Sequence, residues 1–178
     1  MGAKNLKTVL TIIKSQKVNM GGALLDQPLP SKAVKTLDPF VLIHHFKGHT
    51  KAGRLQEEEG VAPHPHRGFS PVTFIYKGEN VHRDSMGNKH VLKEGGTQWL
   101  FSGSGLLHSE RPSKAFAKSG GVSEGIQLWI NAPSKYKMTM PFYAPLTAQD
   151  TPLVSNKDSE IAVVSGQFQG VQGPTKTQ

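Results

Sequence analysis

The sequence predicts an all-β protein, built as a β-sandwich or as a closed barrel of the jelly-roll kind. Short runs rich in β-branched and aromatic residues recur along most of the chain, and turns that contain glycine or proline separate them. Gly occurs 19 times and Pro 12 times in 178 residues, which is high for a helical protein. We find no long amphipathic helical pattern. Repeated short strands of this kind are typical of sandwiches and barrels.

The N-terminal part predicts two short strands and a turn. Residues 7–14 are rich in β-branched residues and predict the first strand, and residues 18–22 predict the turn after it. Residues 23–26 predict the second strand, which we expect Pro28 and Pro30 to end because proline cannot donate to a β-ladder.

A third strand and a long loop follow. Residues 40–46 form a continuous apolar run and predict a strand. Residues 47–62 are polar and show no periodicity, so we expect a loop beside the functional site. Loops of this length in compact domains often act as lids.

The middle of the chain predicts six more strands at short spacing. Turn signals with glycine, asparagine, serine or proline stand between several of the consecutive runs. The expected strands are residues 72–76, 81–84, 90–93, 97–101, 106–111 and 125–130.

The C-terminal part predicts a change of organisation. Residues 131–152 contain four prolines and predict a linker or an extended crossing arm. A further strand is expected at 160–166. We therefore expect one domain at 1–134, followed at 135–178 by a linker and the partial start of a second domain.

Composition excludes several classes of protein. Cysteine is absent, so there is no disulfide framework and no thiolate metal site, and any metal must be bound by His, Asp or Glu. The net charge is 21 − 13 = +8. The lysines are nevertheless scattered, without interleaved aromatic residues, and no nucleic-acid-binding motif is found. We therefore expect a solvated basic surface rather than direct nucleic-acid recognition.

The N-terminus carries no targeting or membrane signal that we recognise. The apolar run at 9–13 is interrupted by Lys14 and is too short for a signal-peptide core or a membrane span. Leu6 replaces the Ser or Thr that a myristoylation motif requires. We expect a soluble protein of the cytoplasm or, in a eukaryote, of the nucleus as well.

Two short stretches carry candidate metal ligands. His64 and His66 stand two residues apart, and so do His108 and Glu110. Side chains two apart on a strand point to the same face, roughly 7 Å apart, so two such pairs on facing strands could converge on one ion. Three imidazoles and one carboxylate suit Fe, Mn, Ni, Cu or Zn better than Ca or Mg.

A histidine on a strand is more often a surface or core residue than a metal ligand. The residues next to these histidines nevertheless favour a metal site. Pro65 restricts the chain between the first two histidines. Gly68 and Gly105 permit tight turns beside the two pairs. Spacing alone leaves the metal site and two ordinary strands as open alternatives.

Longer motifs around these residues resemble the signature of the pirin family, which belongs to the cupin superfamily. They are residues 63–69 (PHPHRGF), 82–88 (HRDSMGN) and 98–110 (QWLFSGSGLLHSE), and residues 37–40 and 127–133 match the same family. The resemblance covers nearly the whole chain. It implies a cupin double-stranded β-helix in which a mononuclear iron, Fe(II), is held by the four residues His64, His66, His108 and Glu110.

Three features bear on how far the resemblance extends. Ser70 stands where the general cupin pattern has a glutamate, so Glu110 would supply the carboxylate, as in pirins. His44 and His45 stand where pirins commonly have an acidic pair at the pocket entrance, which affects the expected substrate preference. They could act as a base or hydrogen-bond donor, or face solvent. Pirins typically have two cupin domains, so residues 135–178 would include the start of the second.

The resemblance implies two functions of different classes. Similarity to pirins with quercetin 2,3-dioxygenase activity implies cleavage of a flavonol by dioxygen with release of carbon monoxide, with Glu110 as the base. The alternative is a metal- and redox-dependent regulator that binds transcription factors or other protein partners without turnover. A cupin that binds metal without catalysis is the third interpretation. Phe40, Phe46 and Trp99 are candidates for apolar pocket walls or for the core.

Overall fold

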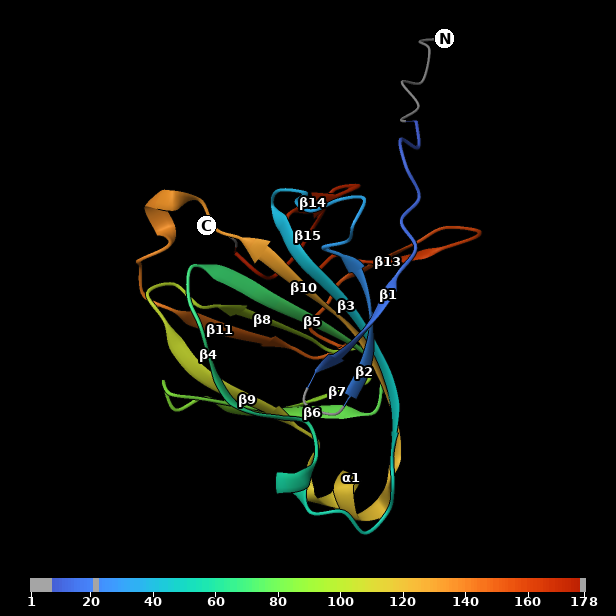
Figure 1. Cartoon of the computed structure of the whole chain (residues 1–178). Coiled ribbons are helices and arrows are strands. Elements are labelled where there is room, and N and C mark those ends of the chain that lie inside the picture. The colour runs from blue at the N-terminus through green and yellow to red at the C-terminus, as the bar shows by residue number, and fades with distance from the viewer. Residues whose placement is uncertain (1–7, 21–22, 177–178) are drawn as a thin grey trace.

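The computed structural model describes residues 8–20 and 23–176 and confirms the all-β architecture (Figure 1). Two antiparallel sheets face each other. One has seven strands in the order β1-β2-β3-β10-β5-β8-β11, and the other has four in the order β4-β9-β6-β7. Two small hairpins, β12–β13 and β14–β15, follow towards the C-terminus.

The seven-stranded sheet consists of β1 (Gln16–Met20), β2 (Ala23–Leu29), β3 (Phe40–Thr50), β5 (Phe69–Lys77), β8 (Thr97–Phe101), β10 (Gly121–Asn131) and β11 (Phe142–Leu146). The four-stranded sheet consists of β4 (Val61–His66), β6 (Glu79–Asp84), β7 (Lys89–Lys93) and β9 (Leu106–Arg111). The hairpin strands are β12 (Leu153–Ser155), β13 (Glu160–Ala162), β14 (Gln167–Phe168) and β15 (Val171–Gln172). Short helical turns are η1 (Gln56–Glu58), α1 (Lys114–Ser119) and η2 (Ser134–Tyr136).

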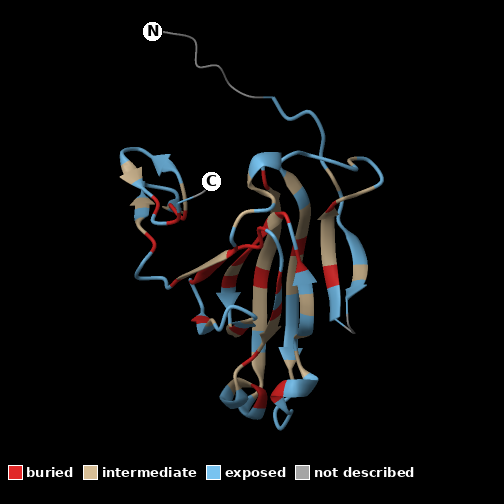
Figure 2. Cartoon of the chain, turned by 90° about the vertical axis from the view of Figure 1, so that its left-hand side faces the viewer, coloured by how far each residue is buried: buried red, intermediate tan, exposed pale blue. Residues whose placement is uncertain are grey.

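Apolar side chains from both sheets form the core. Val72 on β5 and Leu100 on β8 are completely buried, and Val81 on β6 and Leu92 on β7 are nearly so. Figure 2 shows buried residues on the strands and also in several of the segments that connect them. This packing explains why the six strands predicted between residues 72 and 130 are confirmed: each has a partner strand and apolar residues to bury.

A row of polar residues crosses the seven-stranded sheet beside this core. His44, Gln127, Thr73 and Gln98 are cross-strand neighbours on β3, β10, β5 and β8. Thr73 Oγ1 accepts hydrogen bonds from Gln98 Nε2 at 3.3 Å and Gln127 Nε2 at 3.1 Å. Both glutamines also reach Glu110 on β9, so this row faces the four-stranded sheet. The space between the sheets is therefore polar at this level.

The N-terminal prediction was wrong in detail. Residues 8–14 form no strand, and β1 instead occupies residues 16–20, which include part of the predicted turn; residues 7, 21 and 22 lie outside the described part of the chain. Val9, Leu10 and Ile12 are 79%, 95% and 85% exposed, so a β-branched run without a partner did not become a strand. β2 continues through Pro28 to Leu29, because its ladder with β3 is irregular there.

The expected loop at 47–62 is shorter than predicted. β3 continues to Thr50 and β4 begins at Val61, and η1 lies in between. Arg111 on β9 donates through Nη1 to the backbone oxygens of Gln56 at 3.0 Å and Glu59 at 3.2 Å. These hydrogen bonds connect the segment around η1 to β9, the strand that carries His108 and Glu110.

The expected linker at 131–152 contains a strand of the main sheet. β11 pairs with β8 along five residues, from Phe142 opposite Phe101 to Leu146 opposite Thr97. The sheet therefore extends beyond residue 134, although the division into domains at that point stays a prediction. In the region predicted as a strand at 160–166, β13 ends at Ala162. Among the described residues, no helix has the length and apolarity to span a membrane.

Candidate metal centre

Three neighbouring strands of the four-stranded sheet each carry a pair of polar side chains two residues apart. The register places His64 opposite His108, His108 opposite Asp84, and Glu110 opposite His82. The pairs are His64 and His66 on β4, His108 and Glu110 on β9, and His82 and Asp84 on β6. We predicted the first two pairs as ligands and missed the third, although it has the same spacing.

Two glycines make the turns that bring these strands together. Gly68 ends the short connection between β4 and β5 with φ +79°, and its backbone N–H donates to the oxygen of Gly103 at 2.8 Å. Gly105 precedes β9 with φ +126°. Both values lie in the region that favours glycine, so the predicted role of these two residues is confirmed.

The three histidines converge between the sheets. One ring nitrogen each from His64, His66 and His108 forms a group whose members all lie within 4.8 Å of one another. The Nε2 atoms of His64 and His66 are 3.0 Å apart. Two ligands at about 2.1 Å from one metal ion, at right angles to each other, would be separated by about 3 Å. The spacing of this pair therefore fits a shared ion.

The hydrogen bonds leave suitable nitrogens free for a metal. His64 Nδ1 lies 2.8 Å from the backbone oxygen of Ala62 and must donate to it, so in the neutral ring its Nε2 carries a lone pair, which faces His66 Nε2 at 3.0 Å. His108 Nε2 is buried and has no hydrogen-bond partner, and His108 itself is 1% exposed. A buried unpaired nitrogen is costly, and a bound metal ion would remove that cost. The residues therefore fit a metal.

Burial keeps two of these imidazoles uncharged at neutral pH. Burial, and then the neighbouring His108 and His64, lower the pKa of His66 to about 4, although Glu110 opposes this. Burial, and then His64 and His82, lower the pKa of His108 to about 3, although Asp84 opposes this. A metal binds the neutral form of histidine, so both side chains are already in the ligand form.

Glu110 lies beside the histidines, but its carboxylate is held by amides. Oε1 accepts hydrogen bonds from Gln98 Nε2 and from Asn80 Nδ2, the latter at 3.4 Å, and Oε2 accepts from Gln127 Nε2 at 3.1 Å. Trp129 Nε1 donates to Gln127 Oε1 at 3.1 Å, which turns the Gln127 amide nitrogen towards Glu110. The group of three converging histidine nitrogens does not include an oxygen of Glu110. The role of Glu110 as the fourth ligand therefore stays a prediction.

His44 and His45 point to opposite faces of β3 and have different surroundings. His44 is 3% exposed, and its Nε2 donates to Gln27 Oε1 at 2.8 Å. Burial lowers the pKa of His44. His45 is on the outer side, where its Nε2 lies 3.2 Å from Glu124 Oε1. His44 thus joins the polar row inside, and His45 takes part in a surface ion-pair cluster.

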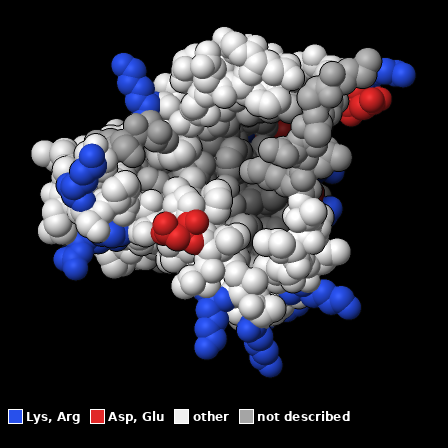
Figure 3. Space-filling view, turned by 90° about the horizontal axis from the view of Figure 1, so that it is seen from above, with Lys and Arg blue, Asp and Glu red and all other residues white. Residues whose placement is uncertain are grey.

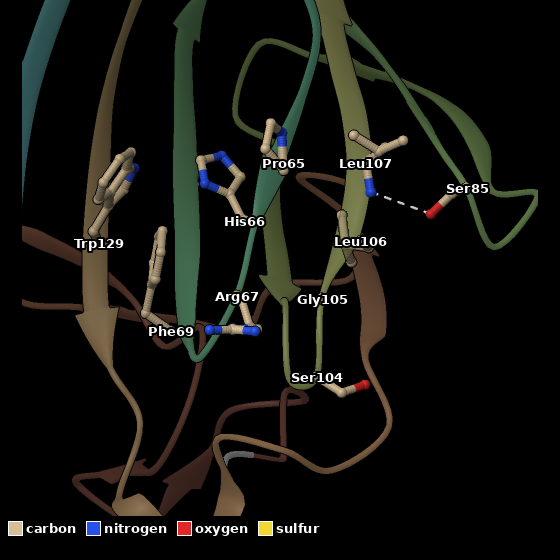
Figure 4. A pocket seen from close by; sticks show the side chains of 10 residues that line it. All are labelled: Pro65, His66, Arg67, Phe69, Ser85, Ser104, Gly105, Leu106, Leu107 and Trp129. Atoms are coloured by element: carbon tan, nitrogen blue, oxygen red, sulfur yellow. Dashed lines mark hydrogen bonds between the residues drawn. The ribbon is translucent and has the colours of Figure 1, made fainter.

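A cavity of about 720 Å³ opens beside His66 (Figure 4). Phe69 and Trp129 line one side, with their ring centroids 4.5 Å apart and their planes tilted by 30°. The Trp129 ring lies 5.2 Å from the His66 ring. Arg67, Ser85 and Ser104 also line the cavity, together with Pro65, Gly105, Leu106 and Leu107. The aromatic wall thus comes from Phe69 and Trp129, and none of the three predicted candidates, Phe40, Phe46 and Trp99, lines this cavity.

Basic side chains do not gather in one place on the face seen in Figure 3. Lys and Arg project at separate points around the outline of the molecule. On this face the basic side chains are therefore spread out, in agreement with the scattered lysines of the sequence.

Two facing antiparallel sheets define a β-barrel of the cupin type, and the three histidines between them could hold a metal ion. The Pirin family model matches residues 22–130, which is more than half of the chain. The chain belongs to the pirin family.

Individual relatives agree with this assignment. The chain is 36% identical over 156 residues to Pirin-1 of Arabidopsis thaliana, covering 88% of this chain and 50% of the relative. It is 40% identical over 143 residues to "Putative quercetin 2,3-dioxygenase PA2418" of Pseudomonas aeruginosa, covering 79% and 50%. The crystal structure of a quercetin 2,3-dioxygenase from Acinetobacter baumannii superimposes with a TM-score of 0.80 at 35% identity, covering 93% of this chain and 58% of that one. The chain thus spans about half the length of the curated relatives it matches.

Proposed function

We propose that this chain forms the metal-binding part of an iron-dependent dioxygenase that acts on flavonols such as quercetin. The observation that carries the proposal is the convergence of His64, His66 and His108 beside a cavity with an aromatic wall. The similarity to a quercetin 2,3-dioxygenase of solved structure supports the choice of substrate class. Because the chain spans about half of its relatives, the proposal concerns the site that this part contains.

The three histidines would hold the metal, and Glu110 would complete the set. Fe(II) is our first choice, and Mn, Ni, Cu and Zn suit the same donors. When bound, the metal would supply Lewis acidity towards a hydroxy-ketone and the redox chemistry that reaction with dioxygen requires. The Glu110 carboxylate would accept the proton of the flavonol 3-hydroxyl, since it lies on the same strand as His108 and two residues away.

The cavity suits a flat aromatic substrate. Its volume of about 720 Å³ lies within the ordinary range of small-molecule sites, roughly 300–1,000 Å³. Phe69 and Trp129 offer ring surfaces against which the fused rings of a flavonol would pack. Arg67, whose guanidinium makes no ion pair among the described residues, lies at the same cavity and would donate hydrogen bonds to the oxygens of the substrate.

The test is turnover by protein of defined metal content. Metal-free protein is reloaded in turn with Fe(II), Mn(II), Ni(II), Cu(II) and Zn(II), and oxygen uptake and carbon monoxide release are measured with quercetin. We expect one carbon monoxide released for each dioxygen consumed with at least the iron form. The matched control substrate is the analogue that lacks the 3-hydroxyl, which has neither the proton for Glu110 nor the hydroxy-ketone and should not react.

One outcome would overturn the enzyme while leaving the metal site in place. Stoichiometric metal binding without consumption of any flavonol would contradict the dioxygenase. Partner binding that depends on the oxidation state of the metal would then favour the regulatory alternative.

A further inference from the structure

We propose that Asp84 and His82 form a hydrogen-bonded relay to His108. This relay fixes which ring nitrogen of His108 carries the proton, and so leaves the lone pair of His108 Nε2 for the metal. The proposal rests on the metal site proposed above. It assigns a role to the third pair of polar residues on the four-stranded sheet. Asp84 and His82 act through His108, and they are therefore positioning residues.

The three side chains form a continuous buried chain of hydrogen bonds. Asp84 Oδ2 lies 3.0 Å from His82 Nε2, and His82 Nδ1 lies 3.4 Å from His108 Nδ1. The side chains of His82 and Asp84 are 0% exposed, and His108 is 1% exposed. No described atom contacts His108 Nε2 by a hydrogen bond. These hydrogen bonds thus run from the Asp84 carboxylate to the ring of His108, whose Nε2 is buried and has no hydrogen-bond partner among the described residues.

The donor and acceptor roles in these hydrogen bonds follow from the surroundings of Asp84. Its Oδ1 accepts from the backbone N–H groups of Met86 at 2.9 Å and Asn88 at 3.0 Å, and its Oδ2 accepts from Asn88 Nδ2 at 2.8 Å. Burial alone would raise the pKa of Asp84, but the hydrogen bonds from His82, Asn88 and Met86 outweigh it and lower the pKa. Asp84 is thus a carboxylate and can only accept.

The positions of the protons follow one after another. Because Asp84 can only accept, His82 carries its proton on Nε2. In the neutral ring, His82 Nδ1 then has a lone pair and must accept from His108 Nδ1–H. His108 Nε2 is left with a lone pair, which is the form that a metal binds. This result agrees with the unpaired, buried state of that atom.

Tyr143 holds the middle member of the relay in place. Its ring stacks on the His82 imidazole with centroids 3.9 Å apart and planes within 6° of each other. Tyr143 lies on β11, which belongs to the opposite sheet. The His82 ring is therefore fixed in its plane from one side while Asp84 fixes its proton. A carboxylate that orients a metal-binding histidine usually contributes 10- to 100-fold to the metal affinity. Here His82 stands between the carboxylate of Asp84 and the ring of His108.

The most informative variant is Asp84→Asn. It keeps the size and shape of the side chain but should reverse the donor and acceptor roles along the relay. The backbone N–H groups of Met86 and Asn88 still require an oxygen on their side, so the amide nitrogen of the new residue would face His82. The side-chain amide of Asn88, which now donates to the same oxygen as His82, would have to turn its own oxygen towards the new nitrogen. His82 would then accept at Nε2 and donate from Nδ1. His108 would accept at Nδ1 and carry its proton on Nε2, where a metal must bind.

The first measurement reads the tautomers in metal-free protein by ¹⁵N NMR of the histidine rings at neutral pH. In the wild type we expect His82 protonated on Nε2 and His108 protonated on Nδ1. In Asp84→Asn both should reverse. A wild-type His108 protonated on Nε2 would overturn the relay, whether or not the variant folds. This measurement does not depend on metal binding, so it separates failure of the relay from failure of the proposed site.

The second measurement is the affinity for Zn²⁺, a redox-stable probe, by competition with a chelator. We expect Asp84→Asn to bind 10- to 100-fold more weakly. The matched control is Asp26→Asn, which makes the same change in a surface pair with Lys17 and should bind within about twofold of the wild type. Asn88→Ala removes one hydrogen bond from Asp84 but keeps the carboxylate, so it too should retain most of the affinity. Reversed tautomers with unchanged affinity would contradict the role of the relay.

Discussion

The imidazoles of His64 and His66 meet edge to face, with their Nε2 atoms 3.0 Å apart and their ring planes at 89°. Side chains two apart on an ideal strand start roughly 7 Å from each other. These two therefore lean towards a common point, which lies next to the ring of His108 at centroid distances of 4.4 and 4.8 Å. The three imidazole rings therefore turn towards one point, where a metal ion could bind.

Removal of one histidine should abolish metal binding. His66→Ala and His108→Ala each delete one of three converging nitrogens, and we expect metal content, measured by elemental analysis, to fall from near-stoichiometric to a small fraction. His49→Ala is the control, because His49 is exposed on β3 and far along that strand from His44. Equal metal in His66→Ala and wild type would contradict the site. Protein for this comparison should carry no histidine tag.

Glu110→Gln should separate the two roles that we propose for Glu110. The variant keeps the length of the side chain but loses the negative charge that three amides now surround. As a base, Glu110 should contribute about 10²- to 10⁴-fold to kcat. As a ligand, its loss should also weaken metal binding. Glu94→Gln, in an exposed turn, is the control, and unchanged turnover together with unchanged metal affinity in Glu110→Gln would show that neither role is correct.

Metal-free protein should lose stability on acidification below pH 6.5. The pKa values of His66 and His108 are lowered to about 4 and about 3, whereas an unfolded histidine titrates near 6.5. Between these values the unfolded chain binds protons that the folded chain does not, so stability falls as the pH falls. Each group contributes a slope of up to about 1.4 kcal/mol per pH unit.

Urea denaturation at several pH values between 7 and 4.5 would measure this slope. Carboxylates also titrate in the lower part of this range, so the comparison is with the double variant His66→Asn/His108→Asn. The double variant should show a clearly shallower dependence. Parallel curves for the two proteins would mean that the buried histidines do not cause the acid sensitivity.

Leu100→Ala should strongly destabilise the fold. Leu100 on β8 is 0% exposed between β5 and β11, and truncation of a buried leucine to alanine costs about 2–5 kcal/mol. Leu153→Ala makes the same change at a side chain that is 52% exposed and should cost less than about 1 kcal/mol. Chemical denaturation of both variants would measure the difference, and similar costs would be inconsistent with the described core.

The short-range pattern of the sequence determined most strands and the candidate ligands. Runs rich in β-branched and aromatic residues, separated by turn residues, specify the six strands predicted between residues 72 and 130. The two-residue period of a strand places His64 with His66, and His108 with Glu110, on one face. The N-terminal run at 8–14 shows the limit of this information: its residues favour a strand, but a strand also needs a partner.

Only the tertiary structure decided which residues surround those ligands. Cross-strand register, which depends on contacts between distant segments, brings Gln98 and Gln127 to Glu110 and places His82 against His108. It also brings Tyr143 from an expected linker onto the ring of His82. The sequence therefore indicated which side chains could bind a metal. The pairing of strands determined their hydrogen-bond partners, because contacts between strands depend on a register that no single segment contains.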